Sequence, residues 1–184
     1  MRIIAGKYQR RIIRPPGNLP VRPTTDLAKE ALFNVLNHHF DFERLRVIDL
    51  FSGTGSIAYE FASRGAKEVV AVDANFKCYE FINHTIRQFA FDNLKAVRAD
   101  VFRFLSYCRP GFDIIFADPP YEMEKFERIP EAVFNRELLS PGGWLILEHP
   151  AGKQFSHFPQ FREERTYGRV HFSFFEKPAT ASKP

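Results

Sequence analysis

Between residues 46 and 148 the chain alternates short apolar segments with segments that carry an apolar residue every three or four positions. The short segments predict β-strands at 46–50, 68–72, 94–98, 112–117 and 144–148. Helical spacing predicts helices at 56–64, 75–89, 101–107 and 125–139. This alternation predicts a doubly wound α/β fold with a mostly parallel sheet, because each helix returns the chain to start another strand in the same direction.

The two ends of the chain have different patterns. Residues 2–5 and 10–14 read as the arms of a short β-hairpin that turns at Gly6, and a proline-rich linker and a helix at 24–40 follow. Residues 160–167 and 169–176 have strand character with no helix between them, which predicts an antiparallel hairpin. With that hairpin the sheet has seven strands. Residues 178–184 are expected to be frayed.

The length and composition favour one ordinary globular domain. The chain has 184 residues, of which 45% are hydrophobic, and no apolar run approaches the roughly 18 residues of a membrane span. The basic start lacks the apolar core of a signal peptide, so we expect a cytoplasmic protein without a membrane partner. Cys78 and Cys108 stand alone, which suggests neither a disulfide framework nor a metal site.

Positive charge is concentrated at the N-terminus. The net charge is +4, yet residues 1–25 contain no acid and six basic residues, namely Arg2, Lys7, Arg10, Arg11, Arg14 and Arg22. Clustered Arg and Lys suit a polyanion, because neutralised phosphates release counterions. The alternative is a solvated basic extension. We take Lys7, Arg10, Arg11 and Arg22 as candidate nucleic-acid contacts.

The most specific motif is Asp118-Pro119-Pro120-Tyr121, which follows the predicted strand 112–117. The two prolines stiffen the turn and fix the direction of its carbonyl groups. The Asp118 carboxylate and the Pro119 carbonyl can then accept hydrogen bonds from one amino group, while Tyr121 offers a flat face to a planar base. The motif predicts a grip for an exocyclic NH2, although a strand can also end in a proline-rich turn without such a role.

A glycine loop joins the first predicted strand to its helix, with the sequence Asp49-Leu50-Phe51-Ser52-Gly53-Thr54-Gly55. The glycines allow a tight turn and a close approach to a ligand, and we expect Phe51 and Ser52 to lie against that ligand. The loop departs from the dinucleotide pattern G-x-G-x-x-G, because Ala58 stands at the last position. Asp49 would repel a pyrophosphate but could bind an amino group, so the ligand should carry a cation.

Two further acids follow the next predicted strands. Asp73 can accept hydrogen bonds from ribose hydroxyls, with Ala74 beside it, and Asp100 can accept the adenine amino proton while Val101 offers a backbone N–H. Each acid alone could simply cap a helix. Together with Asp49 and Asp118 they indicate a nucleoside with a cationic head, which fits S-adenosylmethionine better than NAD. Glu148 could face the same site, but we assign it no role.

At this level the chain resembles the class I S-adenosylmethionine methyltransferases. Its glycine loop matches their cofactor motif, and Asp118 to Tyr121 matches the motif of enzymes that methylate exocyclic or amide nitrogens. Further segments, at 2–8, at 22–26 together with 30–34, and at 63–66, are similar to the bacterial small-subunit (16S) rRNA guanine-N2 methyltransferase family. This resemblance implies a Rossmann-like fold, S-adenosylmethionine as the methyl donor, ribosomal RNA or the small ribosomal subunit as the partner, and no metal.

The resemblance also organises the chain. It implies an RNA-binding hairpin and linker at 1–23 and a methyltransferase domain at 24–177, in a protein that we expect to be monomeric. It assigns catalysis to Asp118, Pro119 and Tyr121. Two alternatives remain open at this point: methylation of adenine N6 or another amino group of a nucleic acid, and an RNA-binding assembly factor that retains the fold without catalysis.

Overall fold

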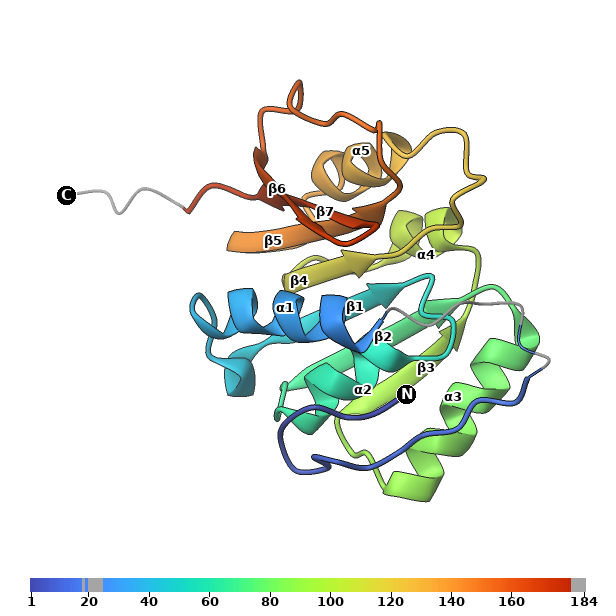
Figure 1. Cartoon of the computed structure of the whole chain (residues 1–184). Helices are drawn as coiled ribbons and strands as arrows, with labels where there is room; N and C mark the ends of the chain where they lie inside the picture. The colour runs from blue at the N-terminus through green and yellow to red at the C-terminus, as the bar shows by residue number, and fades with distance from the viewer. Residues whose placement is uncertain (18, 20–24, 180–184) are drawn as a thin grey trace.

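The computed structural model describes residues 1–17, 19 and 25–179, and a seven-stranded sheet forms its centre (Figure 1). The strand order is β3-β2-β1-β4-β5-β7-β6. The first five strands are parallel, while β7 runs antiparallel to β5 and to β6. The strands are β1 (Arg46–Leu50), β2 (Glu68–Asp73), β3 (Leu94–Arg98), β4 (Phe112–Ala117), β5 (Leu139–His149), β6 (Phe161–Tyr167) and β7 (Val170–Glu176). The predicted doubly wound α/β fold and its C-terminal hairpin are confirmed.

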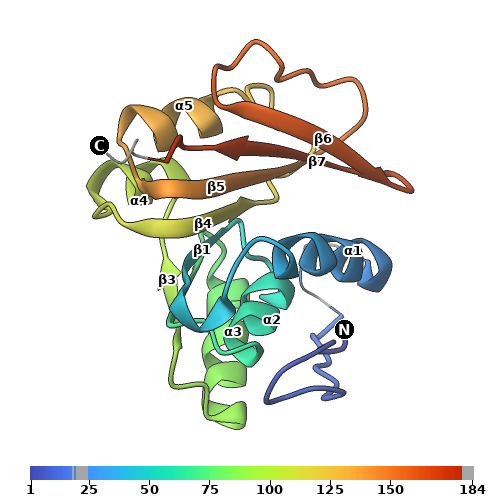
Figure 2. The same ribbon diagram turned by 90° about the vertical axis from the view of Figure 1, so that its left-hand side faces the viewer.

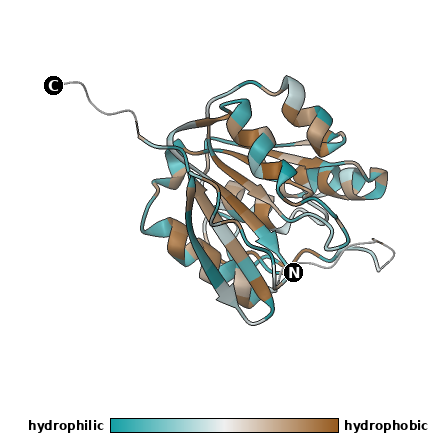
Figure 3. Ribbon diagram, turned by 90° about the horizontal axis from the view of Figure 1, so that it is seen from above, coloured by the Kyte–Doolittle hydropathy of each residue, from teal (hydrophilic) through white to brown (hydrophobic). Residues whose placement is uncertain are grey.

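Helices cover both faces of the sheet, with α1, α2 and α3 on one side and α4 and α5 on the other (Figure 2). Hydrophobic residues are frequent on the strands, whereas the helices carry both hydrophobic and hydrophilic residues, as elements with one face in a core do (Figure 3). The helices are α1 (Asp26–Asn37), α2 (Ser56–Ser63), α3 (Phe76–Phe89), α4 (Val101–Tyr107) and α5 (Arg128–Asn135), with a 3-10 turn at Phe42–Arg44.

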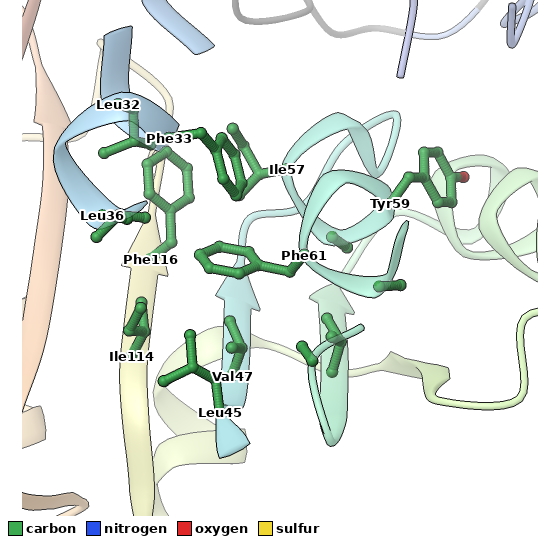
Figure 4. Packing of buried hydrophobic residues seen from close by; sticks show 14 of the residues in the cluster. Leu32, Phe33, Leu36, Leu45, Val47, Ile57, Tyr59, Phe61, Ile114 and Phe116 are labelled. Carbon is green, nitrogen blue, oxygen red and sulfur yellow. The ribbon is translucent and has the colours of Figure 1, made fainter. Parts of the chain in front are cut away.

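Each parallel strand contributes alternate residues to two separate cores. In β1, Val47 belongs to the core under α1 and α2, whereas its neighbour Ile48 belongs to the core under α4 and α5. In the first core, Leu32 and Phe33 of α1 pack towards Phe116 of β4 (Figure 4). The alternation follows from the pleat of a strand, in which successive side chains point to opposite faces.

The end of the last predicted helix and the start of the fifth predicted strand differ most from the structure, and the helix predicted at 24–40 is shorter, spanning Asp26–Asn37. Helix α5 spans only Arg128–Asn135, rather than 125–139, and Pro130 lies in its first turn, where a missing backbone N–H is tolerated. Glu137 then adopts a left-handed conformation with φ of 50°, which ends the helix and lets β5 begin at Leu139. Leu139 therefore belongs to a strand and not to a helix, and Leu138 lies directly before that strand.

The predicted N-terminal hairpin is present in a reduced form. Its arms run antiparallel, with hydrogen bonds from Ile3 N to Arg11 O and from Ile13 N to Met1 O, both 3.0 Å long. Only the pair Arg2 and Ile12 forms a β-bridge, and the arms do not reach the length of strands. A four-residue turn, in which Arg10 has a φ of 69°, lies between the arms and leaves too few paired residues for a regular ladder of hydrogen bonds.

The N-terminal segment (residues 1–13) docks on α2, beside which it runs in Figure 1. The fully buried carboxylate of Glu60 accepts hydrogen bonds from the amides of Ile4 (2.8 Å) and Ala5 (3.0 Å). The amide of Lys7 donates to the carbonyl of Ser63 at 2.7 Å. Ile3 and Ile13 are buried in the core under α1 and α2. The segment is thus part of the packed domain, and its division from the domain at residue 23 remains a prediction.

Gly6 is the residue that makes this close docking possible. Its φ is +84°, and a Cβ at this position would lie 1.9 Å from the carbonyl oxygen of Ser63. Gly6→Ala should therefore lift the segment from α2 and lower the free energy of unfolding by about 2 kcal/mol or more, measured by urea denaturation. The control is Gly17→Ala, whose Cβ would meet none of the described atoms within 4 Å. Equal stability of the two variants would contradict the docking.

Candidate active site

Four carboxylates lie at the carboxyl ends of neighbouring parallel strands: Asp49 (β1), Asp73 (β2), Asp118 (directly after β4) and Glu148 (β5). The residues two positions before them all belong to the core under α1 and α2; they are Val47, Ala71, Phe116 and Ile146. Because side chains alternate along a strand, the four acids leave the sheet on the same face as those residues. The fold thus gathers them at one edge of that face, as expected for a ligand site of an open α/β sheet.

Asp49 is the most deeply buried of these acids, with 2% of its surface exposed. Its Oδ2 accepts a hydrogen bond of 3.1 Å from the amide of Ala58, near the start of α2. Burial raises the pKa of Asp49 well above its ordinary value, and the nearby carboxylates of Asp118 and Asp73 raise it further. A bound cation would relieve this repulsion.

The predicted glycine loop connects β1 to α2 by a series of left-handed residues. Phe51, Gly53 and Gly55 have φ of 56°, 52° and 80°. A Cβ on Gly55 would meet the ring of Tyr59 at 2.6 Å, so glycine is required there by both conformation and packing. Phe51 holds this conformation without being glycine, and such backbone strain is concentrated at ligand sites.

Asp73 joins the glycine loop to β2. Its Oδ2 accepts a 2.8 Å hydrogen bond from the amide of Gly53, and its Oδ1 accepts one of 2.8 Å from the amide of Asn75. Each carboxylate oxygen can still accept a second donor. Ala74, the next residue, is exposed beside it.

Asp100 follows β3 at the same edge, where the neighbouring Ala99 amide donates to the Asp73 carbonyl at 3.1 Å. Its Oδ1 accepts a 2.9 Å hydrogen bond from the Arg103 amide. Asp100 therefore caps α4, which is the helix-capping role that the sequence left open for it. The rest of its exposed carboxylate can still accept a ligand donor. The side chain of Val101 is buried under α4, which leaves only its backbone for a ligand.

Asp118 and Tyr121 form a close group with Glu148, a residue that the sequence reasoning left unassigned. The register Ala117–Leu147 between β4 and β5 brings Asp118 level with Glu148. The Tyr121 hydroxyl donates to Glu148 Oε1 at 3.4 Å, while 46% of the Tyr121 surface remains exposed. Burial raises the pKa of Asp118 to about 7, and burial together with the nearby Asp118 carboxylate raises that of Glu148 to about 8. The sequence held one signal for Glu148: it lies at the end of its strand two residues after a core residue, as Asp118 does.

The candidate nucleic-acid contacts lie on the N-terminal segment, where Lys7, Arg10 and Arg11 are exposed. Arg22 lies outside the described residues. The segment contacts the glycine loop through Met1, whose Sδ accepts a hydrogen bond of 3.8 Å from the Thr54 hydroxyl. The Lys29 ammonium also donates to the carbonyl of Arg2 at 2.6 Å and to Oγ of Ser56, the first residue of α2, at 3.1 Å. The exposed positive charges are thereby held at a fixed place relative to the glycine loop.

Tyr8, which the sequence places next to the basic residues, packs inward. Its ring lies 4.5 Å from that of Phe91, and its hydroxyl donates to the carbonyl of Ala90 at 3.2 Å. The ring is therefore partly buried and packs against the core under α1 and α2.

Neither a metal site nor a membrane-spanning helix is found within the described ranges. No group of three His, Cys, Asp or Glu side chains in residues 1–17, 19 and 25–179 is arranged to hold a metal ion. In the same part of the chain, none of the helices has the length and apolarity needed to cross a bilayer.

The strand order, the two helix layers and the acids at the strand ends define a Rossmann-like α/β protein of the methyltransferase type. A sequence profile of the family described as "Conserved hypothetical protein 95" matches residues 1–176, and the chain belongs to this family. The resemblance noticed in the sequence is thereby confirmed.

Two known sequences and one solved structure illustrate the relationship. The chain is 31% identical over 153 residues to "Putative rRNA methyltransferase YlbH" of Bacillus subtilis, covering 81% of this chain and 82% of that protein. It is 28% identical over 148 residues to "Ribosomal RNA small subunit methyltransferase D" of Escherichia coli, covering 80% and 71%. The solved structure "Putative methyltransferase yhhF from Escherichia coli" superposes with a TM-score of 0.86 at 23% identity, covering 98% and 99%, which shows a shared fold.

The raised pKa values of Asp118 and Glu148 predict the direction of a stability change with pH. Both groups hold protons more tightly in the folded protein than in the unfolded chain. Between about pH 4 and pH 8 the unfolded chain therefore binds fewer protons than the folded protein. The free energy of unfolding should therefore fall as the pH rises through this range. Replacing Glu148 by the uncharged isostere, E148Q, should raise the free energy of unfolding at pH 8.5 by at least about 1.4 kcal/mol, the equivalent of one pKa unit.

Urea denaturation of both proteins at pH 4 and pH 8.5 measures this difference. The two proteins should be nearly equal in stability at pH 4, where the Glu148 carboxyl group is largely protonated in both the folded and the unfolded state. A difference of the same size at both pH values would contradict the assignment.

Proposed function

We propose that this protein transfers a methyl group from S-adenosylmethionine to the exocyclic N2 of a guanine in the 16S rRNA of the small ribosomal subunit. The observation that carries the proposal is the Asp118 to Tyr121 turn at the end of β4, on the same sheet face and at the same edge as Asp49 and the glycine loop. The names of the two curated relatives support rRNA as the substrate, and one of them supports the small subunit. The choice of guanine N2 rests on the family resemblance.

The residues present suit S-adenosylmethionine. Among the described residues, the buried Ser52 Oγ has no hydrogen-bond partner, and both oxygens of Asp73 retain capacity for ribose hydroxyls. The carboxylates around Asp49 suit a cationic head. When bound, the cofactor supplies an electrophilic methyl group on a sulfonium. We assign its binding to Asp49, Phe51, Ser52, Gly53, Gly55, Asp73, Ala74, Asp100 and Val101.

The proposed chemistry follows from the properties of guanine N2. Its lone pair is conjugated with the ring, so the nitrogen attacks well only when it becomes pyramidal. The Asp118 carboxylate and the Pro119 carbonyl would accept hydrogen bonds from its two N–H groups. These hydrogen bonds would stabilise the positive charge that develops on N2. Tyr121 would stack on the base and hold N2 in line with the methyl group, so orientation supplies much of the catalysis.

Asp118 is also suited to receive the proton that N2 loses after methyl transfer. Burial raises its pKa to about 7 in the free protein, and the positively charged N2 that forms on transfer is a much stronger acid than any carboxylic acid, so the proton can pass to the Asp118 carboxylate. We therefore assign Asp118 two successive tasks: it accepts a hydrogen bond from N2 before transfer and takes the proton afterwards.

The test of the function is to incubate the protein with labelled S-adenosylmethionine and unmethylated rRNA, either free or assembled in small subunits, and then to map the labelled nucleoside. Label on N2 of a guanine is the expected result. Label on an adenine would instead establish the adenine alternative, because adenine N6 presents the same NH2 to the motif. Cofactor binding without label transfer to either substrate would favour the assembly-factor alternative.

Asp118→Ala should reduce kcat/KM for rRNA methylation by about 100-fold or more, because the variant loses the group that stabilises the transition state. The fold and RNA binding should be retained. A suitable control is Asp92→Ala, which removes an exposed acid of the loop before β3. Near wild-type turnover in the Asp118 variant would remove Asp118 from the mechanism.

Replacing Arg10 and Arg11 together by alanine should weaken RNA binding and make its salt dependence shallower. Each lost phosphate contact reduces the slope of log K against log salt by about one unit. The matched control replaces Arg109 and Arg136, two exposed arginines at the opposite ends of the strands. Fluorescence anisotropy with labelled rRNA fragments at several salt concentrations measures both variants, and an unchanged slope for the Arg10 and Arg11 variant would refute the role of the N-terminal segment.

A further inference from the structure

Glu148 is a buried carboxylate whose hydrogen bonds are incomplete. Only 4% of its surface is exposed, and its Oε2 has no partner among the described residues. Its other oxygen receives the Tyr121 hydroxyl at 3.4 Å, which is a long hydrogen bond. Its neighbour across the sheet on β7 is the apolar Phe172. A buried acceptor of this kind is costly for folding and is rare without a partner, which indicates that a ligand supplies one.

The position of Glu148 identifies the part of the ligand that it meets. Glu148 lies level with Asp118 on the adjacent strand, and the two carboxyl groups are close enough for Asp118 to raise the pKa of Glu148. Tyr121, the proposed stacking residue, contacts Glu148 directly. A base that stacks on Tyr121 and presents its amino group to Asp118 can therefore place a ring nitrogen next to that amino group against Glu148.

On the basis of the proposed function, we propose that Glu148 determines base specificity by accepting the N1–H of the target guanine through Oε2. In guanine, the N1–H and the N2 amino group are neighbouring donors on one edge, and they match neighbouring carboxylates. One N2 hydrogen then faces Asp118 and the N1 hydrogen faces Glu148. These two donors compensate the charges of the acids and favour the ionised form of both, so guanine binding displaces the proton that the pair holds in the free protein.

Adenine fails this match at a single atom. Its N6 amino group can occupy the grip of Asp118 and Pro119, but its N1 carries a lone pair and no hydrogen. When Glu148 is ionised, as it mostly is at pH 8.5, that lone pair would face Glu148 Oε2, so two acceptors would meet in a buried site and both would lose their hydrogen bonds to water. The Asp118 to Tyr121 motif alone does not distinguish the two bases, whereas its combination with Glu148 does.

The experiment compares two transcripts that differ only in having guanine or adenine at the mapped target nucleotide, at pH 8.5. For the wild-type protein, kcat/KM should strongly favour guanine. For E148Q the ratio of the two values should fall by about tenfold to a hundredfold, because the amide can donate to adenine N1. Glu148→Met is a second variant that removes the acceptor without adding a donor, and its ratio should also fall.

Two controls separate base reading from indirect effects. Tyr121→Phe keeps the ring but removes the hydroxyl that contacts Glu148, and its guanine-to-adenine ratio should equal that of the wild type, whatever its rate. Glu131→Gln removes an exposed carboxylate of α5 and should also leave the ratio unchanged. An unchanged ratio in E148Q and Glu148→Met, or an equal fall of the ratio in Tyr121→Phe, would overturn the proposal. Its failure is distinct from failure of the proposed function, in which the wild-type protein would place no label on guanine.

Discussion

The alignment of parallel strands is the constraint on which the site depends. Parallel pairing brings the carboxyl ends of β2, β1, β4 and β5 to one edge, and the two-residue repeat of each strand decides which face a side chain takes. Asp49, Asp73, Asp118 and Glu148 all end up on the face covered by α1 and α2. A slip of one residue in any strand would move its acid to the opposite core. The register that builds the hydrophobic layers therefore also assembles the site.

Gathering acids at one edge carries an energetic consequence. Burial and mutual repulsion disfavour the ionised forms of Asp49, Asp118 and Glu148, so the apo site opposes stability at neutral pH. The cores on both sides of the sheet offset this cost. The same features suit the proposed reaction, which brings a sulfonium and a row of N–H donors to the acids. Destabilised groups of this kind are frequent where proteins bind and react.

The N-terminal segment connects the proposed RNA contacts to the same framework. Glu60 binds its amides from α2, and Lys29 of α1 links the carbonyl of Arg2 to Ser56 at the start of α2. Arg10 and Arg11 are exposed on this segment, whose backbone is held on the helix that follows the glycine loop. RNA held by these residues would be positioned relative to the proposed cofactor loop, which a loosely tethered extension could not achieve.

The sequence by itself determined the strands and helices of the sheet, because apolar periodicity and the glycine and proline positions are local properties. It also identified Asp118 to Tyr121 and the glycine loop, whose chemistry is written in consecutive residues. It overestimated α5 and the N-terminal hairpin, since apolar residues such as Leu139 fit a helix or a strand equally well until a neighbouring strand is available. Only the tertiary structure decided that Tyr8 belongs to the core, that Glu60 holds the N-terminal segment, and that Glu148 stands beside Asp118. The physical reason is that burial, pairing register and an unpartnered oxygen depend on residues far apart in the chain.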